Sequence, residues 1–165
     1  MERFTEILRR LKAADVEFSL IGGMAAIQYG ASYVTYDVDV CARFNWENLQ
    51  RIHGVLKEMN PRWIIKDMPF ELNEELASRL KNLYLKTDLG RLDCLSEVKG
   101  VGDFDAVMQQ SELVRFPFGE CYVLRIQSLI QAKEAMGRTQ DKLVVSQLRA
   151  IMEKRGERNG PTGNE

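Results

Sequence analysis

Hydrophobic and polar residues alternate along the chain with two different periods, which divide it into helices and strands. Residues 2–14 place their apolar side chains at the three- and four-residue spacing of one helix face. Residues 35–44 instead alternate with a period of two and are rich in β-branched residues, which favours a strand. The same two patterns predict strands over residues 16–23, 83–87 and 91–98 and two more within 112–126, and helices over 24–30, 45–60, 127–137 and 139–155.

The remaining segments complete a single α+β domain. Asp88-Leu89-Gly90 predicts a tight turn that joins residues 83–87 and 91–98 into a hairpin. Residues 62–70 and 72–82 are ambiguous between an edge strand and a short helix, and residues 100–110 predict a loop with a short helix. Because the chain has neither an internal repeat nor a linker, we expect one domain over residues 1–155, followed by a disordered polar tail over residues 156–165.

Composition excludes several classes of protein. The chain has 165 residues, 45% of them hydrophobic, and a net charge of −1, so it does not bind nucleic acid through an overall basic field. Three cysteines without metal-like spacing and a single histidine, His53, argue against a structural zinc site. No segment resembles a signal peptide or reaches the length of a membrane span, which predicts a cytoplasmic protein with no membrane partner.

Two aspartates in the strand over residues 35–44 are the first candidates for chemistry. Asp37 and Asp39 point to the same face of that strand, with Cα atoms roughly 6.5–7 Å apart. Two carboxylates that close raise each other's pKa. Since no Lys or Arg alternates with them on that face, a divalent cation is the natural partner. The alternative is an ordinary solvated strand face.

A third acid favours the metal. Asp93 lies among apolar residues that mark a buried strand, and a charged Asp is rarely buried unless it is paired or binds a metal. If the hairpin strand lay beside residues 35–44, the three acids would form the site that two cations occupy in phosphoryl or nucleotidyl transfer. Gly22 and Gly23, between a strand and a helix, would let backbone amides approach an anion.

The motifs together resemble a known family. The segment GGMAAIQYGASYVTYDVDV, residues 22–40, is similar to the signature of minimal nucleotidyltransferases of the DNA polymerase β superfamily, in the bacterial branch related to abortive-infection toxins. The positions that match are Gly22, Gly23, Ala25, Gly30, Thr35, Asp37 and Asp39. Residues 88–105 resemble the segment with the third metal-binding acid, and residues 122–148 the closing helices. Tyr33 stands where the branch usually has Arg, which places phosphate contact at that point in question.

The resemblance implies a fold and a set of roles. The fold is a small mixed, mostly antiparallel sheet with helices on one side and at the end. Asp37, Asp39 and Asp93 would bind Mg²⁺ or Mn²⁺ and act in catalysis. The residues expected to bind the nucleotide are Gly22, Gly23, Thr35, Lys133 and Arg138.

Two residues near the C-terminal helices can also be weighed from the sequence alone. Lys133 continues the inward stripe of its helix, so it either meets an anion such as a triphosphate or snorkels to solvent. Asp141 follows Thr139, a predicted N-cap, and would favour the helix dipole in the first turn.

The sequence therefore predicts a metal-dependent nucleotidyltransferase. It would transfer a nucleoside monophosphate from an NTP to a hydroxyl of a protein, an RNA or a small molecule, in a toxin–antitoxin context with a small helical partner protein. The alternative is a catalytically weakened domain that binds nucleotide or regulates a partner, which Tyr33 favours and the intact acids disfavour. A carboxylate-metal phosphodiesterase is a third hypothesis, disfavoured by the lack of histidines.

Overall fold

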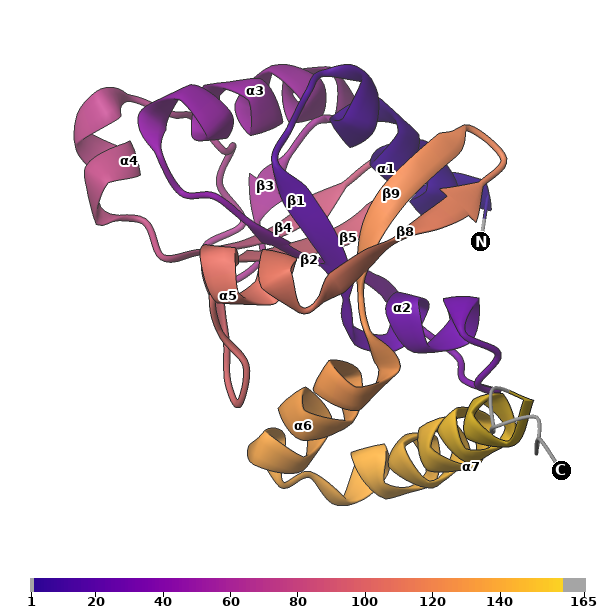
Figure 1. Ribbon diagram of the computed structural model, residues 1–165. Coiled ribbons are helices and arrows are strands. Elements are labelled where there is room, and N and C mark those ends of the chain that lie inside the picture. Colours follow the sequence, from indigo (N-terminus) through magenta and orange to yellow (C-terminus); the bar gives the residue numbers. More distant parts are fainter. Residues whose placement is uncertain (1, 159–165) are drawn as a thin grey trace, which may run out of the picture.

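The computed structural model describes residues 2–158, and its centre is a seven-stranded sheet in the order β3-β4-β5-β2-β1-β9-β8 (Figure 1). The β1–β9 and β2–β5 pairs are parallel and the other four pairs are antiparallel, so the predicted mixed, mostly antiparallel sheet is confirmed. The strands are β1 Phe18–Ile21, β2 Asp37–Ala42, β3 Arg62–Trp63, β4 Asn82–Thr87, β5 Gly90–Leu95, β8 Ser111–Phe116 and β9 Gly119–Leu124.

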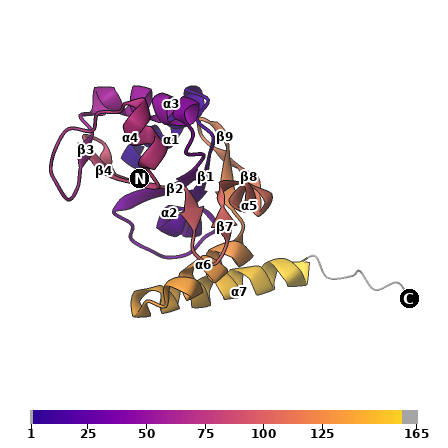
Figure 2. The ribbon, with the colours of Figure 1, turned by 90° about the vertical axis from the view of Figure 1, so that its left-hand side faces the viewer.

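Helices lie at both ends of the molecule, with the sheet between them. In two perpendicular views, α3 lies at one end of the molecule and the α6–α7 pair at the other (Figures 1 and 2). The predicted α+β fold is therefore confirmed. The helices are α1 Glu2–Ala13, α2 Gly22–Gln28, α3 Trp46–Leu56, α4 Glu74–Arg79, α5 Phe104–Gln109, α6 Ile126–Met136 and α7 Lys142–Arg158, with short 3₁₀ helices at Lys57–Met59 and Thr139–Asp141.

Side chains alternate along the central strands, so one face of the sheet is apolar. The other face is covered by a helix at one end and carries the acids at the other. On β2, Val38 and Val40 are buried in the hydrophobic core, while Asp37 and Asp39 point to the opposite face. The far end of that opposite face is covered by α5, whose Val107 carbonyl accepts a hydrogen bond from the buried Ser111 hydroxyl. The hydroxyls of Ser111 and Ser19 are in turn 2.7 Å apart. The acid-bearing end of the same face is thus left for a cavity.

Local signals explain several element boundaries. The Asn45 side chain accepts a hydrogen bond from the backbone N–H of Asn48 and so caps α3, at the start of the helix predicted over residues 45–60. Asn60 ends the following 3₁₀ turn in the left-handed conformation. The predicted hairpin at Asp88-Leu89-Gly90 is confirmed, since β4 and β5 pair from Thr87 and Gly90 onward.

Other boundaries differ from the sequence prediction. Strand β2 begins at Asp37, so Thr35 lies before it, and α2 begins at Gly22, two residues earlier than expected. Residues 97–103, expected to belong to a strand end and a loop, form a second small sheet of β6 Glu97–Val98 and β7 Gly102–Asp103. His53 on α3 is half-buried, with its ring centre 5.3 Å from that of Phe70.

The C-terminal region also differs from the sequence prediction. Thr139 does not cap the last helix: it begins a 3₁₀ turn whose N-cap is Arg138, without a side-chain cap. Helix α7 continues to Arg158, so residues 156–158 of the predicted tail are helical, and residues 159–165 lie outside the described part of the chain. Within residues 2–158, none of the helices combines the length and the apolar character that crossing a bilayer requires.

Candidate active site

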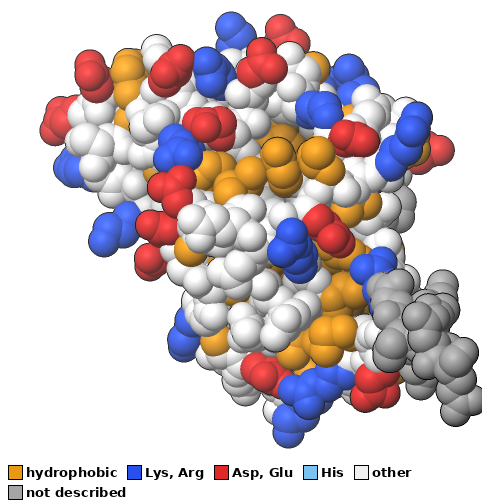
Figure 3. Space-filling view, viewed as in Figure 1, with side chains coloured by type: hydrophobic (Ala, Val, Ile, Leu, Met, Phe, Trp, Pro, Cys, Tyr) orange, Lys and Arg blue, Asp and Glu red, His pale blue; other side chains and the backbone are white. Residues whose placement is uncertain are grey.

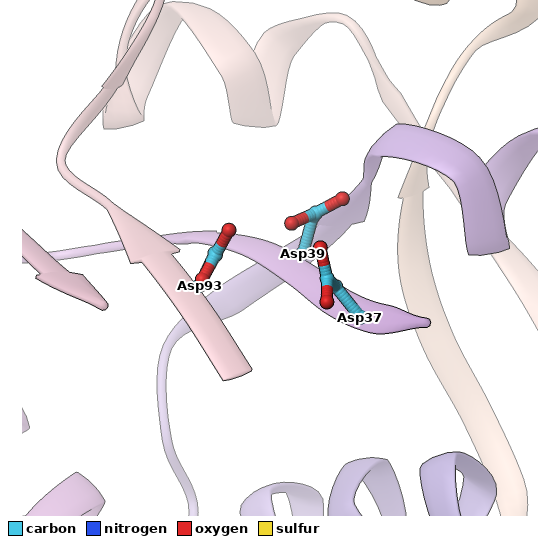
Figure 4. A group of neighbouring side chains, drawn as sticks. All are labelled: Asp37, Asp39 and Asp93. Carbon is cyan, nitrogen blue, oxygen red and sulfur yellow. The ribbon is translucent and has the colours of Figure 1, made fainter. Parts of the chain in front are cut away.

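The three predicted acids meet on neighbouring strands. Asp39 on β2 stands directly beside Asp93 on β5 in the parallel register, and Asp37 is two residues earlier on β2. One oxygen from each carboxylate lies within 4.8 Å of the others, and Figure 4 shows the three side chains gathered from these two strands. The carboxylate oxygens are close enough together to hold a metal ion, and such oxygens are the ligands that Mg²⁺ prefers.

Arg91 supplies a positive charge that the sequence interpretation missed. Its guanidinium donates to both oxygens of Asp93, at 2.8 and 3.0 Å, and its Nε lies 3.7 Å from Asp37 Oδ1. The argument that no Lys or Arg faces the acids considered only their own strand and was wrong for the neighbouring one. Arg91 precedes Asp93 by two residues, so the same alternation rule applied to β5 places it on the acid face.

Burial and mutual repulsion strain the ionised state of this cluster. Burial raises the pKa of Asp39 to about 7, and the nearby charges of Asp93 and Asp37 act in the same direction, against the opposing influence of Lys133 and Arg91. Burial also raises the pKa of Asp37, although Arg91 opposes this. A divalent cation among the three carboxylates would favour their ionised forms, because opposite charge lowers a carboxyl pKa.

Gly22 makes room for the central acid. Ile21, the last residue of β1, is in register with Asp39, so the chain turns into α2 directly beside this carboxylate. Gly22 has a φ of +70°, and a Cβ there would lie 2.3 Å from Asp39 Oδ2. Glycine at this position is therefore required by the acid cluster itself, besides any approach of an anion.

Gly23 is covered by the residue that departs from the family pattern. A Cβ on Gly23 would lie 2.4 Å from Cε1 of Tyr33, so the aromatic ring rests against this backbone. The Nζ of Lys133 lies 5.6 Å from the centre of the same ring. Thr35 also approaches Gly23, but its hydroxyl donates to the backbone carbonyl of Asp37 at 3.0 Å. Tyr33 therefore contributes an aromatic surface where the sequence resemblance led us to expect a guanidinium.

Lys133 is buried and paired. Its side chain is 8% exposed, so the snorkelling alternative is wrong, and its Nζ lies 3.5 Å from Oδ1 of Asp141. Arg138 donates to the same carboxylate at 2.7 and 3.3 Å. Asp141, expected to act on a helix dipole, instead joins two cations that come from α6 and from the segment that follows it. Its single negative charge leaves this group with a net positive charge beside the acids.

One cavity of about 270 Å³ brings these groups together. Of the predicted site residues, it is lined by Gly22, Asp39, Asp93, Lys133 and Arg138, whereas Asp37, Gly23 and Thr35 do not line it. The apolar wall on the α6 side was not anticipated from the sequence; it consists of Leu124, Leu129, Ala132 and Met136. The arrangement places carboxylates on the β2–β5 side and Lys133 and Arg138 on the α6 side, and Lys99 between β6 and β7 adds a third cation to the lining. Such a site can accommodate a phosphate ester and a metal ion.

The mixed sheet and its flanking helices form a fold that solved nucleotidyltransferase structures share. No protein-family model matches the sequence, and no curated protein does. Solved structures match over nearly the whole chain. The lincomycin-bound lincosamide antibiotic adenylyltransferase LnuA superposes with a TM-score of 0.65 at 13% identity, over 92% of this chain and 97% of that one.

Two further structures show the same fold. A putative nucleotidyltransferase from Thermotoga maritima matches with a TM-score of 0.57 at 18% identity, over 92% of this chain and 91% of that one. The antibiotic-resistance factor ANT(2'')-Ia, in complex with adenylyl-2''-tobramycin, matches with a TM-score of 0.55 at 13% identity, over 97% of this chain and 100% of that one. At these identities the likeness concerns the fold.

Proposed function

We propose that this protein is a metal-dependent nucleotidyltransferase that transfers a nucleoside monophosphate from an NTP to a hydroxyl group. The observation that carries the proposal is the convergence of Asp37, Asp39 and Asp93 within 4.8 Å, beside a cavity whose other wall holds Lys133 and Arg138. Nucleotidyltransferases among the solved structures share the fold.

The three carboxylates fit a hard divalent cation, since they offer oxygen ligands from two neighbouring strands. Mg²⁺ or Mn²⁺ held by them would stabilise negative charge on the phosphate oxygens. Asp93 would exchange its contact with Arg91 for this role, which leaves the Arg91 guanidinium free to meet an anionic group beside the acids.

The protein's own residues divide the reaction between two sides of the cavity. Lys133 and Arg138 would attract the triphosphate from the α6 side. Asp93, on the side of β4, would accept the proton of the acceptor hydroxyl as its oxygen bonds to the α-phosphorus. The bond between that phosphorus and the bridging oxygen breaks, and pyrophosphate leaves.

Label transfer tests this proposal. With ATP labelled at the α-phosphate and Mg²⁺ or Mn²⁺, label should pass to a hydroxyl acceptor, whereas a γ-phosphate label should leave with pyrophosphate. Asp39→Asn should reduce transfer by about a hundredfold or more, because several kcal/mol of charge stabilisation is lost. Asp88→Asn, at an exposed carboxyl in the β4–β5 turn, is the matched control and should keep full activity.

A catalytically weakened nucleotide-binding domain is the second candidate, because Tyr33 rests on Gly23 and Arg91 occupies Asp93. Both candidates predict that ATP with Mg²⁺ raises the melting temperature, by the equivalent of about 2.7 kcal/mol at a hundredfold excess over Kd. Only the enzyme transfers label. Nucleotide binding without transfer to any protein, RNA or small-molecule acceptor would favour the weakened domain.

Small molecules are the acceptor class with most support. The structural neighbours include a lincosamide adenylyltransferase and a protein solved with adenylyl-2''-tobramycin. A toxin–antitoxin context with a helical partner protein stays a prediction from the sequence resemblance.

A further inference from the structure

A second cavity, of about 490 Å³, opens beside the first at the β3–β4 edge of the sheet. Its walls are mainly apolar and come from β3 and the turn after it, and from α4 with the residue that follows it. Two of the lining residues are well exposed: Ile65 at 91% and Met68 at 57%. We call this cavity the Trp63 groove; its apolar lining is Trp63, Ile65, Met68, Pro69, Leu76 and Leu80.

Tyr84 connects the groove to the acid cluster. This residue lines both cavities. It also stands in register with Asp93 across β4 and β5, and Asp93 is in turn in register with Asp39. Because neighbouring strands lie about 4.8 Å apart, the Tyr84 backbone is one strand spacing from Asp93 and two from Asp39. Tyr84 is thus the wall that the two cavities share, and a molecule seated in the groove lies next to the acid-lined cavity across this residue.

The charge of the lining restricts what the groove can bind. Among the described residues that line the groove, Lys66 is the only charged one, and none is a carboxylate. A polyamine would meet no negative partner among these residues and would lose hydration without compensation. An uncharged carbon skeleton instead gains about 25 cal/mol for each Å² of apolar surface it buries.

We propose that the Trp63 groove is the acceptor site, and that the acceptor is an uncharged, largely apolar small molecule with a hydroxyl at the end that reaches Asp93. The inference rests on the proposed function, because it specifies the acceptor for that reaction. The volume is within the range of small-molecule pockets, of a few hundred to about 1,000 Å³. The groove also borders the cluster from β4, whereas the cations assigned to the triphosphate, Lys133 and Arg138, come from α6 and the segment after it.

The two tryptophans of the chain make the site directly observable. The side chain of Trp63 lines the groove, whereas Trp46 lies on α3 outside it, so its indole N–H is an internal control. In ¹⁵N-resolved NMR spectra, assigned with Trp46→Phe, we expect 4-tert-butylcyclohexanol to shift the Trp63 indole signal saturably and to leave Trp46 unmoved. Tobramycin, a polycation, should shift neither.

Variants at exposed positions separate specific binding from a loss of folding. Ile65→Glu places a carboxylate in the groove and should weaken alcohol binding tenfold or more. Leu143→Glu, at a residue 66% exposed on α7, should leave it unchanged. In label-transfer assays, Ile65→Glu should raise the KM for the alcohol with little change in the apparent affinity for ATP. The proposed acceptor site would be refuted if the alcohol left the Trp63 signal unmoved, or if Ile65→Glu bound the alcohol as tightly as wild type does.

The proposed acceptor site and the proposed reaction can be refuted independently of each other. Asp39→Asn should abolish label transfer but retain the Trp63 shift, because residue 39 does not line the groove. Loss of the shift in an active enzyme would refute the acceptor site alone. A retained shift in a wild-type protein that transfers no label would refute the proposed function and leave the groove as a binding site for apolar alcohols.

Discussion

Asp39 is an acid whose burial makes the metal-free fold sensitive to pH. Its pKa rises from 3.8 to about 7 on folding, so the native state holds a proton that the unfolded chain has released over this interval. The stabilising contribution is therefore complete below about pH 4 and is lost as the pH rises through about 7. The linked free energy is roughly 4 kcal/mol at most, because each tenfold change in proton affinity corresponds to about 1.4 kcal/mol.

We therefore predict that urea unfolding in the presence of a chelator will show wild type losing stability relative to Asp39→Asn between pH 5 and pH 8. Asparagine has no charge to bury, so the variant lacks this loss. Asp88→Asn should follow wild type at both values, because residue 88 is exposed. Parallel pH dependence of wild type and Asp39→Asn would show that the carboxyl of residue 39 does not titrate between these limits.

At the scale of residues, the sequence was sufficient to predict that the three acids lie close together. It was not sufficient to predict the charged side chains that pair with the site residues. Asp37 and Asp39 follow from strand alternation, and the hairpin turn allowed Asp93 to be expected beside them. Arg91 follows from the same rule once β5 is considered. The partner of Lys133 does not, because Asp141 lies beyond the end of α6 and only the chain reversal at Gly137, in the left-handed conformation, brings it back.

The β1–α2 junction depends on one glycine. Gly22→Ala would place a methyl group 2.3 Å from Asp39 Oδ2 at a φ of +70°, a left-handed conformation that costs an alanine about 1–2 kcal/mol. We expect urea unfolding to show destabilisation of at least that size and the thermal stabilisation by Mn²⁺ to disappear.

Gly54→Ala is the matched control for this prediction. Gly54 lies within α3 with no atom within 4 Å of the added Cβ, so this variant should gain up to about 1 kcal/mol. If Gly22→Ala behaved like Gly54→Ala, the close approach to Asp39 would be relieved at little cost.

The α6–α7 turn is held by a buried ion group. Asp141→Asn should cost about 3 kcal/mol, because the side chain of Lys133 is 8% exposed and would keep its charge without its carboxylate. Lys133→Met in the same chain should recover part of that loss. The control is Glu134→Gln, which removes an ion pair with half-exposed Arg149 and should cost less than about 1 kcal/mol in thermal or urea unfolding.

At the scale of elements, predictions from the sequence were good where one periodic pattern dominates. Helix α3 has an Asn cap and a regular apolar stripe, and the β4–β5 hairpin has a turn of polar and glycine residues between apolar strands. The β6–β7 pair was missed because each strand has only two residues, too short for alternation to register. The start of α2 was missed because glycine is a poor helix former.

The whole molecule shares one hydrophobic core, although α7 lies at the end opposite α3 (Figure 2). Val144 and Leu148 of α7 are buried in the same cluster as Leu49 and Ile52 of α3. We therefore predict a two-state transition in which tryptophan fluorescence and far-ultraviolet circular dichroism coincide. Trp46 and Trp63 report on the α3 and β3 region, so an earlier loss of helical signal would show that the α6–α7 pair unfolds separately.

At this scale the sequence predicted the class of fold but not the strand order. The parallel β1–β9 pair joins residues about a hundred positions apart, and no local pattern specifies that contact. The surface agrees with the expectation from net charge: on the face in Figure 3, acidic and basic side chains are interspersed, without a continuous basic area.

Arg91 bears on whether the chain can fold before a metal ion is bound. Three neighbouring carboxylates without a counter-charge would repel one another, so the chain would fold only once a metal was bound, as small metal-dependent domains do. Here a guanidinium of the same sheet already neutralises Asp93. We therefore expect folding to be independent of the proposed metal: newly synthesised chains should fold where free divalent ions are scarce, and a chelator should abolish the proposed activity without unfolding the protein.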